Sequence, residues 1–239
     1  MRKIFAIAFA CTISILAFSQ TKPTMPVKFA NRAADHIMVQ LAGNFWSGTA
    51  DSVSSYVNKF NRSANVYLMY DKQFKTNPSL SAGIGVGVGT SNIYFSKMET
   101  RIAAISPKLP FIRTDTGNNY KKYKLATAFL EIPVELRFTA KPETPNKSLK
   151  AAIGLKVGTL INAHTKGRNL QNSAGNKLNG FTVKENSKSF FNSTRIAATA
   201  RVGYGIFSLF GSYNLTGIFK DGVAPDTKLI QVGIAISGL

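Results

Sequence analysis

A strict two-residue alternation of apolar with small or polar side chains is the feature that most limits what this chain can fold into. From Leu80 to Gly89 every even position is apolar and every odd position is serine or glycine. From Leu149 to Gly158 the odd positions are apolar, and isoleucine or valine occupies every even position from Ile230 to Ile236. Successive side chains of a strand point to opposite faces of a sheet, so each segment reads as a strand with one apolar face. A helical period fits none of them.

The same pattern predicts eight strands. We place them at about residues 36–47, 62–75, 79–95, 123–140, 148–163, 192–204, 206–217 and 228–239. The connections after the second, fourth and sixth strands are short, and two of the others, 96–122 and 164–191, are very long. Short turns at one rim and long loops at the other are typical of outer-membrane barrels, and each strand exceeds the ~9–11 residues needed to cross a bilayer at a tilt. The sequence therefore predicts an all-β protein, an eight-stranded up-and-down antiparallel transmembrane β-barrel.

A soluble barrel of the lipocalin kind is the main alternative, and a two-sheet sandwich is a lesser one. A lipocalin hides its apolar face and exposes the polar one, whereas the polar face here is rich in glycine, as a narrow filled interior requires. The apolar face carries aromatic residues towards the strand ends, as the interfacial girdles of a membrane barrel do. These are Phe45, Tyr70, Phe74, Phe138, Tyr204, Phe207 and Tyr213.

The N-terminus has the pattern of an export signal. Arg2 and Lys3 precede an apolar run from Ile4 to Phe18, and Ala17 and Ser19 are the small residues at positions −3 and −1 of a cleavage site after Ser19. We expect a signal peptide at 1–19, a periplasmic lead-in at 20–35 and the barrel at 36–239, integral to the bacterial outer membrane. The only cysteine, Cys11, lies in the signal, so the exported chain has no thiolate or disulfide chemistry.

One strand carries a family resemblance. The segment from Phe129 to Phe138, FLEIPVELRF, resembles the "YLEIPxxLKY" strand of the PorT-type outer-membrane β-barrel family of Bacteroidota. The Gly-alternating third strand and the overall length are similar as well. The resemblance implies an outer-membrane barrel and, through the member that gives the family its name, a link to the type IX secretion apparatus.

Charged residues share the polar parity of several strands. A charge facing hydrocarbon at mid-bilayer costs ~2–4 kcal/mol for Lys or Arg, so these side chains should point into the lumen and pair there. We expect Glu131 and Glu135 to pair with some of the bases, and Pro133 to cause a bulge or weakened pairing, because it lacks a backbone donor. The expected lumen cluster is Asp71, Glu131, Glu135, Arg137, Lys150, Lys156, Arg195 and Arg201.

The long loops are strongly basic. Without Arg2 and Lys3 the chain keeps 28 basic and 11 acidic residues. Much of the excess lies in the two longest loops, at Lys97, Arg101, Lys108, Arg113, Lys121, Lys122, Lys166, Arg168, Lys177, Lys184 and Lys188. Phosphorylated lipopolysaccharide is the nearest polyanion to such a rim, although solvated loop charge is an equal alternative. Nucleic acid is not an expected partner of an exported barrel.

Catalytic and cofactor sites have little support in the sequence. His164 could meet Ser189 or Ser193 and Glu185 to form a Ser/His/acid site, and the second histidine, His36, begins the first strand, but no local motif supports catalysis. The alternate glycines after Leu80 lie within a strand, so they are not a nucleotide-binding loop. We expect no enzyme activity, no metal and no cofactor.

Three functions are consistent with these features. The first is a structural or accessory subunit of an envelope complex, which the family resemblance would relate to type IX secretion. The second is a surface protein that binds lipopolysaccharide or an external partner through its basic loops. The third, a lipid-modifying enzyme that uses His164, is the least supported. An eight-stranded barrel has room only for its own side chains, which argues against transport.

Overall fold

The computed structural model describes residues 37–237. The expected signal peptide, the lead-in and His36 lie outside the described residues. Within the described part of the chain, no helix has both the length and the apolar character required to cross a membrane.

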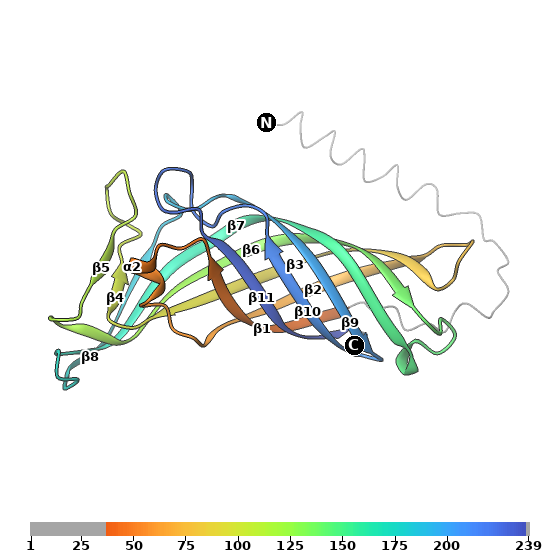
Figure 1. Ribbon diagram of the computed structural model, residues 1–239, viewed down its shortest axis with the longest axis horizontal. Coiled ribbons are helices and arrows are strands. Elements are labelled where there is room, and N and C mark those ends of the chain that lie inside the picture. Colours follow the sequence, from red (N-terminus) through yellow and green to blue (C-terminus); the bar gives the residue numbers. More distant parts are fainter. Residues whose placement is uncertain (1–36, 238–239) are drawn as a thin grey trace, which may run out of the picture. The chain divides into compact units, whose positions relative to one another are not determined.

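Eight antiparallel strands form a closed ring (Figure 1). Neighbours along the sheet follow the order β6-β3-β2-β1-β11-β10-β9-β7, and pairing of β6 with β7 closes it. The ring strands are β1 (Ile37–Ser47), β2 (Asn61–Gln73), β3 (Leu80–Phe95), β6 (Asn119–Thr139), β7 (Leu149–Gln171), β9 (Thr194–Tyr204), β10 (Phe207–Asn214) and β11 (Lys228–Ser237). The predicted eight-stranded barrel is confirmed.

Short turns and long loops segregate to opposite ends of the ring. The turn end carries the connections 74–79, 140–148 and 205–206, and the loop end carries 48–60, 96–118, 172–193 and 215–227. Pairing of Met38 with Ser237 places both ends of the described chain at the turn end. Outer-membrane barrels keep their long loops on the extracellular side, so the loop end faces outwards from the cell.

The two longest connections contain secondary structure that the sequence did not predict. The expected loop 164–191 is wrong for most of its length, since β7 runs on to Gln171 and β8 (Lys177–Asn186) pairs back along it. In the other loop, β4 (Met98–Thr100) and β5 (Phe111–Arg113) form a second hairpin, and β6 begins four residues before its predicted start at 123. The loop end also holds a short helix, α2 (Asp51–Ser54), and a 3-10 turn, Pro145–Lys147, lies at the turn end.

The alternation in the sequence becomes an inside and an outside. Side chains of the apolar parity are exposed on the outer wall, for example Leu68, Ile153 and Leu209, each at least 60% exposed. All seven aromatic residues expected in the girdles are also on the outer wall and at least 41% exposed. The opposite parity is buried in the lumen, where close packing leaves no space for a Cβ at glycines such as Gly83, Gly87 and Gly158.

Pro133 interrupts the pairing of its strand with one neighbour, whereas the bulge lies elsewhere. Pairing of β6 with β7 runs without a shift through Pro133 and Lys156, and the bulge falls between Ala128 and Phe129, with Ile161 as the extra residue on β7. The expected bulge at Pro133 is therefore wrong for this side of the strand. On the β3 side the register is unchanged, but no pairs form between Val134 and Glu131, which is the weakened pairing expected from the missing proline donor.

Candidate functional site

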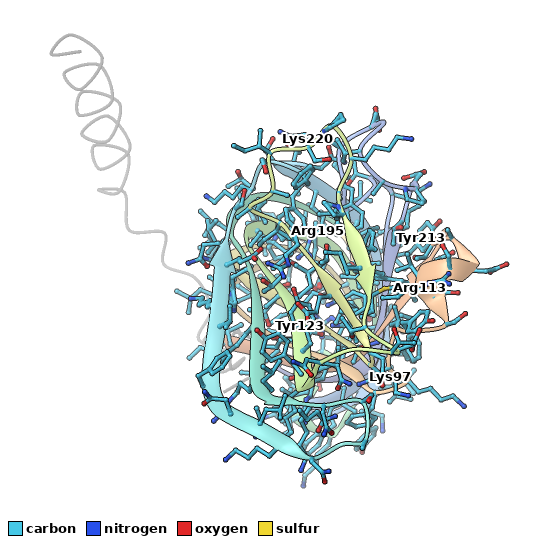
Figure 2. The ribbon with its side chains drawn as sticks, turned by 90° about the vertical axis from the view of Figure 1, so that its left-hand side faces the viewer. Lys97, Arg113, Tyr123, Arg195, Tyr213 and Lys220 are labelled. Carbon is cyan, nitrogen blue, oxygen red and sulfur yellow. The ribbon has the colours of Figure 1, made fainter. Side chains whose placement is uncertain are left out.

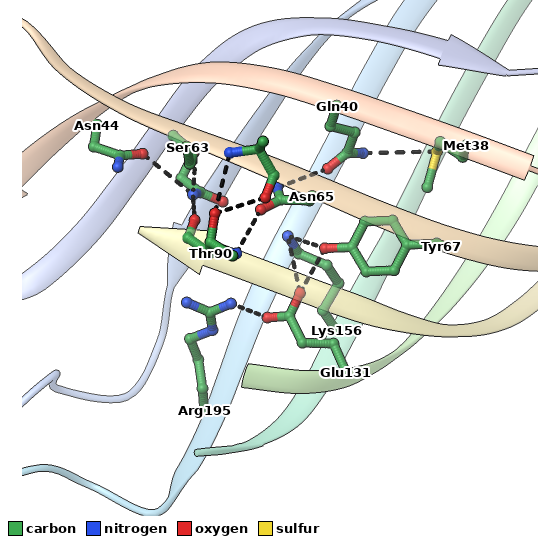
Figure 3. A network of polar contacts seen from close by, with 12 residues as sticks. Met38, Gln40, Asn44, Ser63, Asn65, Tyr67, Thr90, Glu131, Lys156 and Arg195 are labelled. Atoms are coloured by element: carbon green, nitrogen blue, oxygen red, sulfur yellow. Dashed lines mark hydrogen bonds and ion pairs between the residues drawn. The ribbon is translucent and has the colours of Figure 1, made fainter. Parts of the chain in front are cut away.

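The lumen holds two carboxylates, each surrounded by cations from other strands. Glu131, which is fully buried on β6, forms a close ion pair with Arg195 from β9, and its Oε2 lies 3.9 Å from Lys156 Nζ of β7. Tyr67 of β2 donates its hydroxyl proton to the same Oε2 at 2.5 Å (Figure 3). One carboxylate thus ties together four strands of the ring.

The second carboxylate, Glu135, lies four residues further along β6, closer to the turn end. Its Oε2 accepts hydrogen bonds from Arg137 Nε at 2.9 Å and from Arg201 Nη2 at 3.0 Å. Arg137 Nη1 also lies 3.6 Å from Asp71 Oδ1 of β2. Lys150 is buried on the same inner wall and is 8% exposed. The structure therefore places all eight residues of the expected lumen cluster inside the barrel, and seven of them form two groups of ion pairs, one around each glutamate, which we call the charge network.

Glycines make the space that these side chains occupy. Glu131 lies between Gly87 of β3 and Gly158 of β7 in the strand register. Glu135 lies in the same way between Gly83 and Gly154. A Cβ on Gly158 would be 2.8 Å from Glu131 Cγ, closer than carbon atoms pack. The alternate glycines of β3 and β7 are the wall against which the glutamates pack.

A layer of amides lies above the charges, towards the loop end. Asn65 Nδ2 donates to Gln40 Oε1 at 3.2 Å, and Gln231 Nε2 donates to Asn44 Oδ1 at 3.2 Å and to Ser63 Oγ at 3.0 Å. This layer is not among the features predicted from the sequence. Strand parity could have found it, because all five residues alternate with outward apolar side chains.

An aromatic and aliphatic cluster closes the loop end, and we call it the aromatic cap. Trp46 packs edge-on against Phe95 and Phe219, with ring centroids 5.7 and 5.8 Å apart. Figure 2, which looks in from this end, shows Tyr123 within the ring of strands. The buried members of the aromatic cap are Val53, Ile93, Phe95, Met98, Ile102, Leu109, Tyr123, Leu125, Phe129, Leu160, Ala163, Phe190, Phe191, Phe219 and Leu229. Because these residues come from loops as well as strands, the cap fixes the loops over the mouth of the barrel.

The two hairpins at the loop end form what we call the platform, residues 96–118 and 164–191. They contact each other through Arg101, whose guanidinium lies 3.8 Å from Glu99 and 3.7 Å from Glu185. Burial raises the pKa of Glu99; the neighbouring Arg101 lowers it and Glu185 raises it. At the rim, Tyr56 donates to Asp115 at 2.6 Å, a bond that raises the pKa of the tyrosine.

Most of the expected basic loop residues are exposed at the loop end. Arg113 lies over the Tyr56 ring at 5.5 Å, and Lys97 adopts a positive φ of 55° in the turn that leads to β4. Lys166 is half-buried, and the others are exposed: Lys97, Arg101, Lys108, Arg113, Lys121, Lys122, Arg168, Lys177, Lys184 and Lys188. Basic side chains form two rows across neighbouring strands. In the first, Lys166 of β7 pairs with Lys124 of β6 and with Lys184 of β8. In the second, Lys122 of β6 pairs with Arg168 of β7.

The residues of the expected Ser/His/acid arrangement engage other groups. His164 Nδ1 lies 2.7 Å from Asn162 Oδ1, and Glu185 forms its ion pair with Arg101. The Ser189 hydroxyl lies 2.9 Å from that of Ser187. Over residues 37–237, no three His, Cys, Asp or Glu side chains are grouped so that they could hold a metal ion.

Sequence comparison assigns the chain to a class of protein. The family model described as "outer membrane protein beta-barrel domain" matches residues 18–220, and the chain belongs to this family. It is an integral outer-membrane β-barrel protein. No curated protein matches the chain.

Two solved structures are similar in fold. Neisserial surface protein A is 9% identical with a TM-score of 0.36, and the match covers 84% of this chain and 94% of that one. Ail, the attachment invasion locus protein of Yersinia pestis, is 13% identical with a TM-score of 0.34, over the same shares of the two chains.

Proposed function

We propose that this protein is a non-transporting, non-enzymatic barrel whose platform binds another component of the cell envelope. The observation that carries the proposal is the combination of a filled lumen with ordered outer loops. The charge network and the amide layer occupy the lumen, and the aromatic cap covers it. A barrel built in this way offers a fixed surface and no path for a solute.

The proposed partner is a subunit of an envelope complex. The resemblance of the Phe129–Phe138 strand to the PorT type supports a complex related to type IX secretion. The platform suits such a role because its hairpins are braced by Arg101 and by the cap, so little conformational entropy is lost on binding.

A second candidate is binding of lipopolysaccharide at the rim. The row formed by Lys124, Lys166 and Lys184 favours it, because three neighbouring cations present a multivalent surface to lipid phosphates.

Affinity purification from detergent-solubilised envelopes tests the main proposal. We compare the wild-type chain with a variant in which residues 168–182 are replaced by a two-residue turn, which removes the tip of the β7–β8 hairpin. The matched control changes the turn end, Asn77→Ser. A partner present in near-stoichiometric amount with the wild type and Asn77→Ser, and lost with the shortened hairpin, supports the proposal. A barrel that purifies alone, or a partner retained by the shortened hairpin, contradicts it.

A further inference from the structure

The seam between β2 and β3 is held by side chains near the loop end. Backbone pairing is continuous from Gln73–Ser81 up to Asn65–Gly89, and the next pair is Arg62–Asn92. In the gap, Thr90 Oγ1 accepts a hydrogen bond from Ala64 N at 3.2 Å and donates to Ala64 O at 2.7 Å. The Thr90 amide donates to Asn65 Oδ1 at 3.0 Å (Figure 3). The two backbones are thus spread apart here.

A hollow of about 660 Å³ lies in the outer wall at this seam. Its floor is made of small residues, Gly43, Ala64 and Thr90, all of the outward parity. Leu41 and Phe60 contribute apolar surface to its sides. Most of the lipid-facing wall carries large aliphatic side chains, so this is a place where an apolar ligand can lie below the level of the surrounding surface.

Two cations line the same hollow at its loop end. The Arg62 guanidinium lies 5.4 Å from the centre of the Tyr94 ring, and Lys124 Nζ donates to Asn92 Oδ1 at 2.6 Å. No carboxylate is among the residues that line it, all of which belong to the described range 37–237. The row from Lys124 through Lys166 to Lys184 carries the positive charge further around the wall.

The height of the hollow identifies the kind of ligand. Towards the turn end, β2 and β3 present only apolar outward residues next to it, Val66 and Val88. Towards the loop end they present Arg62 and Asn92. The hollow therefore spans the boundary between hydrocarbon and headgroups in the outer leaflet, with its apolar part in the first and its cations in the second.

We propose that this hollow binds lipid A, the phosphorylated glycolipid of the outer leaflet. One acyl chain lies over Gly43 and Ala64, and phosphates bind Arg62 and Lys124. The row of cations beyond Lys124 favours a lipid with more than one phosphate over a glycerophospholipid with a single one. This proposal deepens the second candidate function, binding of lipopolysaccharide, and rests on it, because Lys124 belongs to the same row of cations. It does not depend on the protein partner proposed for the platform.

Substitution of the floor glycine tests the apolar part. Gly43 has no positive φ, and a Cβ there would meet its nearest atoms at 3.6 Å or more, so Gly43→Leu fits the backbone and fills the hollow. The matched control is Gly211→Leu on β10, an outward glycine whose Cβ would meet nothing within 4 Å. The double variant R62Q/K124Q tests the headgroup part without altering the floor.

Native mass spectrometry of the refolded barrels, titrated in detergent with bis-phosphorylated lipid A, gives the readout. Heat-modifiability on gels first confirms that each variant is folded. We expect Gly43→Leu and R62Q/K124Q each to weaken binding by about tenfold or more, and Gly211→Leu to match the wild type. If Gly43→Leu fails to fold, R62Q/K124Q decides the question.

Three results would overturn the proposal. The first is equal lipid A binding by the wild type, Gly43→Leu and R62Q/K124Q. The second is equal binding of phosphatidylglycerol and lipid A by the wild type, which would assign the hollow to any anionic lipid. The third is a dimer in the wild type that Gly43→Leu abolishes, which would assign it to a second copy of the chain.

Discussion

At the scale of single residues, the lumen depends on pairs of glycine and glutamate in the strand register. Glu131 and Glu135 each need a glycine on both neighbouring strands, and each needs cations from strands distant in the sequence. Replacing a buried ion pair by apolar groups is often neutral for stability, whereas removing the space or one partner is costly. The observed register is thus one in which each glutamate faces a glycine on both neighbouring strands.

The glycine opposite Glu131 provides a first prediction. We expect Gly158→Ala to lower the free energy of unfolding by about 1–3 kcal/mol, because its Cβ would lie 2.8 Å from Glu131 Cγ. Urea titrations of the barrel in vesicles, read by heat-modifiability, measure the change. Gly211→Ala, whose Cβ has open space, serves as the control and should leave the midpoint unchanged. Equal midpoints for both variants would show that Glu131 shifts without cost.

Glu99 provides a second prediction, on the platform. Its pKa is raised in the folded protein, so the stability linked to its proton is present below the unfolded value of 4.5 and is lost as the pH rises through the folded pKa. We expect Glu99→Gln, which cannot ionise, to protect the amides of β4 and β5 from hydrogen exchange more than the wild type does at pH 7. The difference should vanish below pH 4.5. Stronger protection in the wild type at pH 7 would mean that the pair with Arg101 outweighs burial.

At the scale of elements, a strand could be predicted from the sequence where its two faces differ in their surroundings. The ring strands were predictable because one face contacts lipid and the other a polar lumen. The polarity of each side chain therefore indicates the face on which it lies. The hairpin strand β8 is exposed over almost its whole length, so its two faces have similar surroundings and its sequence need not alternate between apolar and polar residues. The strands β4 and β5 have only three residues each, too few for a period.

The aromatic cap escaped prediction for a different reason. Phe190, Phe191 and Phe219 lie in connections, and their burial depends on loops from opposite sides of the ring meeting over the mouth. The number of large apolar side chains in supposedly solvated loops was the available signal. The lumen charges, in contrast, follow from parity within single strands, although which cation faces which carboxylate required the register between strands.

The cap can be tested at its centre. Phe219 contacts Trp46, Phe111 and Phe191, and we expect Phe219→Ala to cost about 3–5 kcal/mol of local stability. Trp46 is the only tryptophan, so its emission should shift to longer wavelength while the barrel stays heat-modifiable. Phe207→Ala, at a lipid-facing position that is 59% exposed, should leave the emission unchanged. An unshifted spectrum in Phe219→Ala would mean that the cap does not exclude water from Trp46.

At the scale of the whole molecule, the lumen is obstructed at three levels: charges, amides and cap. Removal of the loop-end hairpin tip, residues 168–182, leaves all three in place, because Glu131 and Glu135 are held by the ring strands and the members of the cap lie outside this segment. We expect no arabinose flux into liposomes, either for the wild type or for the chain with residues 168–182 replaced by a turn. Swelling of liposomes that contain the shortened chain would show that the hairpin, and not the network, closes the barrel.

The segregation of loops and turns fixes the orientation in the membrane, and trypsin can read it. Lys177 is exposed at the loop end, whereas Lys75 and Lys147 are exposed at the turn end. Long loops of outer-membrane barrels face the medium, so on intact cells we expect cleavage after Lys177 and protection of Lys75 and Lys147. Permeabilised cells should lose that protection, and Lys177→Gln should remove the corresponding fragment from intact cells. Cleavage after Lys75 or Lys147 on intact cells, with Lys177 protected, would show that the orientation is the reverse. The hollow at Gly43 and Ala64 would then lie in the inner leaflet, where no lipid A could reach it.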